Sequence, residues 1–296
     1  MEKNNVYIII INYKNYDDTK ECIESLKHIN DMGYHIVVVD NDSKDGSKQR
    51  LKENFENLIE VIENDHNYGF GIANNIGAQY AINKGATHIL LLNNDTTVDP
   101  MFLSNLMKKI NDQTICVPKI LSYYDRNKVW YAGGRIDRIR GTSLHYGRFK
   151  EDSDFFSTEK KVNYLTGCCA LIPVSVIDRI GLFGDEFFLY FEDMDLSIKC
   201  LYEGIEILYV PDSVIYHKEG KSSGGKKSKS TVYYANRNRF YIIRKYNRYF
   251  GLISHIYTYA TRFLLYLYGI IDNNNYRIIK KAYGDYKSKK MGESNI

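Results

Sequence analysis

The sequence predicts an α/β protein with a mostly parallel central sheet, helices on both faces of that sheet, and a helical extension at the C-terminal end. Two observations predict the sheet. Four apolar runs alternate with helical patterns over about the first 95 residues, which is the order of a doubly wound nucleotide-binding sheet. In addition, acidic or amide residues follow these runs closely, where the ligands of such sheets bind.

Each expected strand of the first half is a run of apolar, mostly β-branched or leucine residues that stops at polar residues. Such runs are typical of strands buried on both faces of a parallel sheet. The helices between them place apolar residues three or four positions apart, as in a helix buried on one face. We expect strands over residues 6–11, 36–39, 59–63 and 89–92, and helices over residues 18–29, 48–55 and after Gly71.

The fourth strand ends in the most informative stretch of the chain, HILLLNNDTTVDP over residues 88–100. Its apolar run stops at Asn93, Asn94 and Asp95. Because ligands of open α/β sheets bind outside the carboxyl ends of the strands, Asp95 is well placed to meet one. A helix cap or a turn residue is the alternative explanation for this aspartate. The functional interpretation therefore needs support from elsewhere in the chain.

Acidic side chains also close the second strand, in the turn DNDSKDGS. Asp40 and Asp42 are candidates to accept hydrogen bonds from a nucleotide base or from ribose hydroxyls. The first half contains neither G-x-G-x-x-G nor G-x-x-x-x-G-K-[ST], so neither a Rossmann dinucleotide site nor a P-loop is supported. Carboxylates meet phosphates only with a metal between them, since direct contact is repulsive. Asp95 is therefore a candidate to hold a cation that in turn holds a diphosphate.

The second half carries further strand patterns and the only tryptophan. We expect strands over residues 115–121, 162–173 (broken at Gly167), 205–210 and 214–216, and a helix over residues 175–180. Trp130 precedes the pair Gly133-Gly134. Its flat ring would serve either as a platform for an acceptor sugar or as part of the buried core, and the sequence leaves both open.

A second acidic group, FEDMD, opens a helix after an apolar run. Glu192, Asp193 and Asp195 fall in its first turn, where the helix dipole favours carboxylates even when they only cap the helix. The last expected strand ends at His217, which is either structural or part of a ligand site. The segment KEGKSSGGKKSKS follows without an apolar residue. Such a segment is flexible, and it is either a linker or a lid over an anionic ligand.

The pattern of the C-terminal residues, about 231–296, predicts a basic, amphipathic helical extension. Arg262 and scattered polar residues argue against a membrane-spanning helix. The apolar face suits either an anionic bilayer surface or packing on the catalytic domain or on another subunit, which would make a homodimer. This face contains Ile253, Ile256, Tyr257, Ala260, Leu264, Leu267, Tyr268 and Ile271, with His255, Thr258 and Arg262 away from it.

The composition limits the size of the core, the kind of partner and the cellular compartment. With 296 residues, of which 44% are hydrophobic, the chain can bury a large core. The net charge of +4 is too small to predict nucleic-acid binding. The five cysteines include no CxxC pair, which indicates buried thiols in a reducing compartment. The apolar run near the N-terminus is too short for a signal peptide, so we expect a cytoplasmic protein associated with the inner face of the membrane.

Taken together, these stretches resemble glycosyltransferase family 2, the inverting transferases of the GT-A fold, and within it the rhamnosyltransferase-like branch that makes bacterial cell-surface polysaccharides. The similarity covers residues 6–248, and its motifs occur in the family's order. The motifs are VVVDNDSKDGS, NYGFGIANNIG, LLLNNDTTVDP, TGCCALIP, FEDMD and VIYH, followed by YYANRNRFYIIRKY. The chain departs from the family at its metal-binding DxD motif, where Asn93 replaces the first aspartate.

The resemblance implies roles for the matched residues. Asp193 is implied as the general base, and Asp95 as a ligand of Mg²⁺ or Mn²⁺ with help from His217. Three residues are implied to orient the acceptor: Trp130, Glu192 and Asp195. The donor nucleotide is implied to bind at Asn12, Asp40, Asp42, Asn67, Gly69, Asn74 and Asn94.

The resemblance also implies the reaction and the division of the chain. A sugar would pass from dTDP-rhamnose or a UDP-hexose to a hydroxyl of a glycan or lipid-linked oligosaccharide, in a single metal-assisted displacement that inverts the anomeric centre. The catalytic domain would span residues 1–230, with a donor half over 1–100, an acceptor half over 101–218 and a lid over 219–230. A nucleotidyltransferase and a non-catalytic carbohydrate-binding module are the alternatives. The former usually has a basic, glycine-rich loop near its N-terminus, whereas this chain has acidic turns there.

Overall fold

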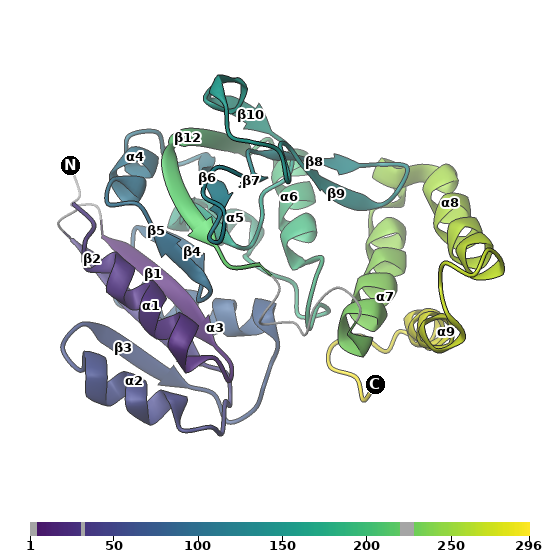
Figure 1. The fold of residues 1–296 in the computed structure, drawn as a ribbon, viewed down its shortest axis with the longest axis horizontal. Helices are drawn as coiled ribbons and strands as arrows, with labels where there is room; N and C mark the ends of the chain where they lie inside the picture. Colours follow the sequence, from purple (N-terminus) through teal and green to yellow (C-terminus); the bar gives the residue numbers. More distant parts are fainter. Residues whose placement is uncertain (1–4, 31–32, 220–227) are drawn as a thin grey trace.

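The computed structural model describes residues 5–30, 33–219 and 228–296 (Figure 1). The first part of the chain alternates strands and helices, as the apolar runs predict. Its elements are β1 (Val6–Asn12), α1 (Tyr16–Leu26), β2 (Tyr34–Asp40), α2 (Ser47–Phe55), β3 (Ile59–Glu63), α3 (Phe70–Asn83) and β4 (His88–Asn93).

The middle of the chain adds strands to the same sheet and a separate hairpin. It also supplies α4 (Phe102–Met107), the short 3₁₀ helix Asp154–Phe156, α5 (Val174–Ile180) and α6 (Glu192–Glu203). The strands are β5 (Thr96–Val98), β6 (Thr114–Ser122), β7 (Val129–Tyr131), β8 (Gly134–Asp137), β9 (Thr142–His145), β10 (Lys160–Val162), β11 (Cys169–Pro173) and β12 (Glu206–His217).

The central sheet has the order β10-β12-β6-β11-β4-β1-β2-β3 over its main path. Strands β4, β1, β2 and β3 are parallel, and the register pairs Asn12 with Asp40 and Ile11 with Asn93. The carboxyl ends of β1, β2 and β4, each of which carries a polar residue, therefore lie side by side at one end of the sheet. Strand β11 runs antiparallel between β4 and β6, and β5, β7 and β10 also pair antiparallel with their neighbours.

Helices cover both faces of the parallel part of the sheet, as expected. Helices α1 and α2 lie in front of the strands in Figure 1, and α3 lies beyond them. Gly77 brings α3 close to the sheet, because a Cβ atom there would lie 2.5 Å from the side chain of Ile9 and 3.0 Å from that of Val39. All five cysteines are buried free thiols, in agreement with the sequence.

The second half differs from expectation in three places. The two strands expected over residues 205–210 and 214–216 form one strand, β12, with an irregularity between Val210 and Val214. The single strand expected over residues 162–173 is two, β10 and β11, which pair with different neighbours. The hairpin of β8 and β9 and the short strand β5 were not predicted, because strands of three or four residues leave little periodic pattern.

The C-terminal part consists of α7 (Lys229–Lys245), α8 (Asn247–Leu267) and α9 (Asn273–Lys287). Helix α7 joins the main core through the buried side chains of Ile242 and Ile243. Helices α8 and α9 lie to the right of the sheet in Figure 1, where the β8–β9 hairpin extends toward α8. In the part of the chain that the structure describes, no helix has the length and apolar character to cross a membrane. Most of the lid expected over residues 219–230 lies outside the described residues.

Candidate active site

A hydrogen-bond network organises the polar edge of the sheet around Asn12 and Asp40. The amide nitrogen of Asn12 donates to Asp40 Oδ2 at 2.7 Å and lies 3.0 Å from the hydroxyls of Ser43 and Ser47. Ser43 donates to Asp40 through its backbone amide at 3.0 Å and through its hydroxyl at 2.7 Å. Both oxygens of the buried Asp40 carboxylate therefore accept hydrogen bonds from the protein. This carboxylate fixes the shape of the turn after β2.

Asn94 joins the same network through Thr19. The Thr19 hydroxyl donates to Asn12 Oδ1 at 2.8 Å and accepts a hydrogen bond from Asn94 Nδ2 at 2.8 Å. The ends of β1, β2 and β4 are thus linked by buried polar side chains. The structure brings three of the implied donor residues together: Asn12, Asp40 and Asn94.

A second network holds the loop before α3. Asn41 donates to Asn67 Oδ1 at 2.8 Å, and this oxygen also accepts from the Gly69 amide at 3.0 Å. Gly69 has φ +83°, and a Cβ atom there would lie 2.2 Å from the Phe188 carbonyl oxygen. Only glycine permits this approach. The loop of Asn67 and Gly69 is therefore packed directly against the segment that precedes α6.

Asp42 and Asn74 lie outside both networks. Asp42 has a left-handed backbone conformation and forms an ion pair with Lys44 at 2.8 Å. Asn74 is buried within α3, where its amide donates to the Phe70 carbonyl at 2.9 Å. Asp42 thus shapes the turn after β2, and Asn74 stabilises the first turn of α3 in this structure.

Asp95 and His217 meet because β5 pairs with β12. The antiparallel register sets His217 opposite Thr96, the residue that follows Asp95. The Nε2 atom of His217 lies 3.2 Å from Asp95 Oδ1, and both side chains are buried. The Lys218 amide donates to the Asp95 carbonyl at 2.9 Å, which ties the end of β12 to this position. Two residues far apart in the sequence are thereby placed as neighbouring candidate ligands.

This pair fits a divalent cation. Two ligands in adjacent octahedral positions at about 2.1 Å from an ion lie roughly 3 Å apart, close to the 3.2 Å separation of Asp95 Oδ1 and His217 Nε2. The described residues contain no group of three or more His, Cys, Asp or Glu side chains placed to hold a metal. An ion at this pair would therefore take its remaining ligands from substrate and water.

Buried polar atoms without a hydrogen-bond partner in the described chain gather beside this pair. They are Asn93 Oδ1, Trp130 Nε1, Arg148 Nε and His217 Nδ1. Unpaired buried polar atoms are costly and therefore uncommon in folded proteins. Their concentration at one place indicates that this region is built to receive a polar ligand.

Trp130 lies between the candidate metal pair and the hairpin. Its ring packs edge-to-face on His217 at 4.5 Å and on His145 at 4.7 Å between ring centroids. The His145 ring in turn stacks on Tyr164 at 5.7 Å. Burial, together with the positive charge of Arg148, lowers the pKa of His145 to about 3, so this ring is neutral at physiological pH.

These aromatic contacts lead to Asp193. The Tyr164 hydroxyl donates to Asp193 Oδ2 at 2.6 Å, and the Gly167 amide lies 3.4 Å from the same oxygen. The Met194 amide donates to Asp193 Oδ1 at 2.8 Å. A continuous line of contacts therefore connects the Asp95–His217 pair with the carboxylate at the start of α6.

Glu192 and Asp193 form a coupled carboxylate pair. Burial raises the pKa of Glu192 to about 8, and the neighbouring charge of Asp193 adds to the rise. Burial also raises the pKa of Asp193, but the hydrogen bonds from Tyr164 and from the backbone amides oppose that increase. The hydrogen bonds therefore favour the ionised form of Asp193, whereas burial and the charge of Asp193 favour the protonated form of Glu192.

Known proteins are similar to this chain in sequence and in fold. Residues 7–181 match the family model described as glycosyl transferase family 2, and these residues make up more than half of the chain. The chain belongs to this family. It is 24% identical to the dTDP-rhamnosyl transferase RfbF of Shigella flexneri, over 81% of this chain and 80% of that protein. It is 26% identical to the rhamnosyltransferase WbbL of Escherichia coli, over 82% of this chain and 97% of that protein.

Solved structures agree on the fold of this glycosyltransferase, which is GT-A. Residues 1–349 of Staphylococcus aureus TarS, crystallised with UDP-GlcNAc, superpose with a TM-score of 0.65 at 15% identity, over 95% of this chain and 80% of that one. GalNAc-T7 with UDP, GalNAc and Mn²⁺ gives a TM-score of 0.70 at 18% identity. That match covers 97% of this chain but 56% of GalNAc-T7, so this chain spans little more than half of it.

The three residues that the resemblance implies for the acceptor occupy different environments in the glycosyltransferase. Trp130 is partly exposed beside His217, and Glu192 is buried beside Asp193. Asp195 is fully buried, where it lies 2.8 Å from Lys245 Nζ and accepts a hydrogen bond from the Tyr246 hydroxyl at 2.9 Å. Asp195 thus anchors the C-terminal helices to α6, and any effect on an acceptor would be indirect.

Several residues at the site were not predicted from the sequence. Tyr164 and His145 connect Trp130 with Asp193, while Thr19 and Asn41 complete the donor-side networks. Tyr164 lies in the loop between β10 and β11, and His145 ends the four-residue strand β9, so neither carries a periodic signal. The position of Tyr164 only three residues before Gly167, at the start of the acceptor-side motif, was the one available indication.

Proposed function

We propose that this glycosyltransferase moves a sugar from a nucleotide-diphosphate sugar, dTDP-rhamnose or a UDP-hexose, to a hydroxyl of a glycan or lipid-linked acceptor in cell-surface polysaccharide synthesis. The two relatives support a rhamnosyl donor, since both are named as rhamnosyltransferases and are matched over most of their length. The UDP-hexose alternative draws on the TarS complex with UDP-GlcNAc. The observation that carries the proposal is the cluster of unpaired buried polar atoms in the described residues beside Asp95 and His217.

On the donor side, the Asn12–Asp40 and Asn41–Asn67 networks form a rigid polar edge. Preformed polar groups cost little to reorganise when a nucleotide binds. Asp95 and His217 would hold Mg²⁺ or Mn²⁺. Bound there, the ion would neutralise the negative charge that develops on the leaving diphosphate.

On the acceptor side, Asp193 takes the proton of the attacking hydroxyl. Tyr164 and the Gly167 and Met194 amides orient its carboxylate, and Glu192 stays protonated beside it at neutral pH. The acceptor oxygen forms its bond to the anomeric carbon while the bond to the donor phosphate oxygen breaks. Because the attack comes opposite the leaving group, the configuration at the anomeric carbon is inverted.

We further propose that the enzyme works at the inner face of the cytoplasmic membrane, where a lipid-linked acceptor would be presented. The exposed apolar residues of α8 and the basic side chains around them support this location. Association of two copies through the C-terminal helices is the alternative use of the same surface.

A thermal-shift panel tests the proposed function. The nucleotides UDP, dTDP, GDP and CMP are each added with Mn²⁺, with Mg²⁺ or with EDTA. A ligand that binds the folded state stabilises it by roughly 2.7 kcal/mol at a hundred times its dissociation constant. We expect stabilisation by dTDP or UDP that requires the metal, and its loss in Asp95→Ala.

The panel separates the possible failures. Equal stabilisation with metal and with EDTA would contradict the metal assignment to Asp95 and His217. No response to any nucleotide from folded protein would contradict the proposed donor. A response in Asp95→Ala as large as in the unmodified enzyme would make Asp95 a turn residue, as the sequence alone allows.

A further inference from the structure

Helix α8 presents its apolar side chains to solvent and its polar side chains to the protein. Ser254 and Thr258, one turn apart, are both fully buried. Ser254 lies beside Gly141 at the turn of the β8–β9 hairpin, where an added Cβ would come within 3.4 Å of its hydroxyl. This is the reverse of the arrangement expected for a helix that packs on a protein core by its apolar face.

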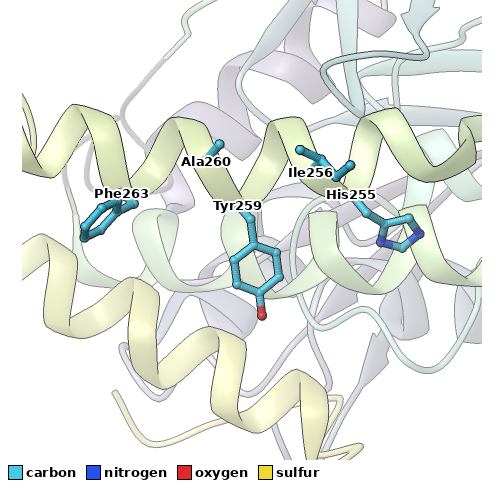
Figure 2. Close-up of a pocket in the computed structure, with 5 residues that line it drawn as sticks. All are labelled: His255, Ile256, Tyr259, Ala260 and Phe263. Carbon is cyan, nitrogen blue, oxygen red and sulfur yellow. The ribbon is translucent and has the colours of Figure 1, made fainter.

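The outward face of α8 and the following turn is apolar over five turns. Large apolar surfaces of this kind are uncommon on isolated soluble proteins and mark interaction sites. Figure 2 shows side chains from this helix, including Ile256 and Phe263, around a hollow of about 520 Å³. The exposed residues are Leu252, Ile253, Ile256, Tyr259, Phe263, Leu264, Leu265, Leu267, Tyr268 and Ile270.

A second pocket, of about 590 Å³, lies where this apolar face meets the β8–β9 hairpin and α7. Three arginines line it: Arg140 from the hairpin, Arg239 from α7 and Arg262 from α8. Its remaining wall includes Leu264, Tyr268 and other apolar side chains. A pocket lined by both guanidinium groups and apolar side chains matches an amphipathic anion.

Two of these arginines have no carboxylate partner in the described residues. Arg262 donates only to the neutral oxygens of Asn236 at 3.1 Å and Thr261 at 2.9 Å. Burial lowers its pKa to about 10, which reflects a charge held without a counter-ion. Arg239 has a buried Nε atom with no hydrogen-bond partner in the described chain. Arg239 and Arg262 are partly buried, and guanidinium groups withdrawn from water normally pair with anions. Within the described residues, only Arg140 of the three has a carboxylate partner, Asp137 at 3.8 Å.

The surrounding sequence excludes acidic groups altogether. Residues 220–271 contain no aspartate or glutamate, whereas their described part alone has seven lysines and arginines. A two-fold dimer through α8 would place this basic surface against its own copy, and like charges would repel. An anionic partner would instead be attracted to this basic surface and neutralise its positive charge. The charge pattern therefore favours a lipid surface over a second copy.

We propose that α8 lies on a membrane and that Arg140, Arg239 and Arg262 bind the phosphate of an anionic lipid headgroup. The apolar face would enter the boundary between headgroups and acyl chains, while the arginines pair with the phosphate. This inference specifies the membrane location that forms part of the proposed function. It makes no use of the transfer reaction, so vesicle binding tests it independently of the donor and of the base.

The site is physically connected to the catalytic residues through strand β9. Thr142, at one end of this strand, lines the arginine pocket, and His145, at the other end, packs between Trp130 and Tyr164. Three residues along a strand span about 10 Å. A lipid held at the pocket would therefore keep the acceptor side of the active site close to the membrane surface.

Sedimentation of the full chain with vesicles tests the proposal. One set of vesicles contains phosphatidylcholine alone, and the other also contains phosphatidic acid. We expect binding to the second set, and a reduction of about tenfold or more in Arg239→Gln/Arg262→Gln. The matched control, Lys20→Gln/Lys108→Gln, removes the same charge from exposed positions on the α1 and α4 side and should retain most of the binding. Thermal unfolding checks that each variant is folded.

Further variants and measurements distinguish a lipid from a free anion and from a second copy of the chain. Ile256→Asn and Phe263→Asn, at exposed positions of α8, should also release the vesicles. Equal binding to both vesicle sets, or equal loss in the charge control, would overturn the arginine assignment. Stabilisation by inorganic phosphate without vesicle binding would show a free-anion site instead. A dimer in light scattering that Phe263→Asn dissociates would assign the surface to a second copy.

Discussion

Asp40 and Asp193 both follow an apolar stretch, and each begins a turn or a helix. Their surroundings nevertheless differ in burial and in the effect on the carboxylate. Asp40 accepts three hydrogen bonds from Asn12 and Ser43 and is almost completely enclosed. Asp193 remains partly exposed beside Glu192, and burial raises the pKa of both groups. The first carboxylate is satisfied by the fold, and the second is held in a state that favours taking up a proton.

This difference indicates a structural role for Asp40 and agrees with the proposed catalytic role of Asp193. The enclosed Asp40 carboxylate, bonded to Asn12 and Ser43, contributes to the shape of the donor edge. A carboxylate whose pKa is raised toward the working pH is a better base. The same chemical substitution at the two positions should therefore have opposite consequences.

Asp193→Asn should produce the largest loss of activity. Removing the proposed base should lower the turnover number about a hundredfold or more, because no other carboxylate in the described residues forms a hydrogen bond with Tyr164. Nucleotide affinity should stay nearly unchanged, since Asp193 makes no hydrogen bond to the donor-side network. Steady-state kinetics and calorimetric nucleotide titration measure the two quantities. Normal turnover in this variant would remove the base assignment.

Asp40→Asn should instead damage the fold. An amide at this position sets its nitrogen against the Asn12 donor or the Ser43 amide, so a buried polar group loses its partner. The free energy of unfolding should fall by about 1–3 kcal/mol, and nucleotide affinity should fall with it. Urea unfolding of both variants makes the comparison direct, because Asp193→Asn should be close to the unmodified enzyme. Equal stability of Asp40→Asn and the unmodified enzyme would contradict the scaffold role.

Tyr164→Phe should have a smaller effect, about tenfold on turnover, with a specific signature. The Tyr164 hydroxyl lowers the pKa of Asp193, so its removal should raise that pKa further. The base would then be protonated at a higher pH, and the acidic limb of the kcat/KM profile should move upward. A fall in activity at all pH values, without movement of this limb, would indicate that Tyr164 only packs beside His145.

The parts of this molecule that the sequence predicted depend on local pattern. The four parallel strands and their helices follow from apolar periodicity, and the polar strand ends follow from their order along the chain. The neighbouring positions of Asp95 and His217 required the resemblance to the family, because β5 and β12 are far apart in sequence. His145 at the end of β9 and Tyr164 in the loop after β10 meet through a ring contact, which no spacing rule encodes.

Burial was the quantity that the sequence could not supply. Asp195 and Asp193 are two residues apart in the same first turn, and the dipole argument treats them alike. The structure separates them, because Lys245 and Tyr246 from the C-terminal helices enclose Asp195. The amphipathic pattern of α8 was similarly clear in the sequence, but the buried positions of Ser254 and Thr258 were needed to show which side faces outward.

Glu192→Gln should have the smallest effect on activity and the clearest effect on stability against pH. Glutamine resembles the protonated Glu192 side chain, so turnover at neutral pH should remain nearly unchanged. The folded-state pKa of about 8 lies above the unfolded value of 4.5, so the folded state binds the proton more tightly. The free energy of unfolding of the unmodified enzyme should therefore decline as the pH rises from about 5 toward 8. In Glu192→Gln this decline should be smaller, because the glutamine does not titrate. Parallel unfolding curves for the two proteins across this range would mean that Glu192 is ionised throughout, and Asp193 would then need another explanation for its role as the base.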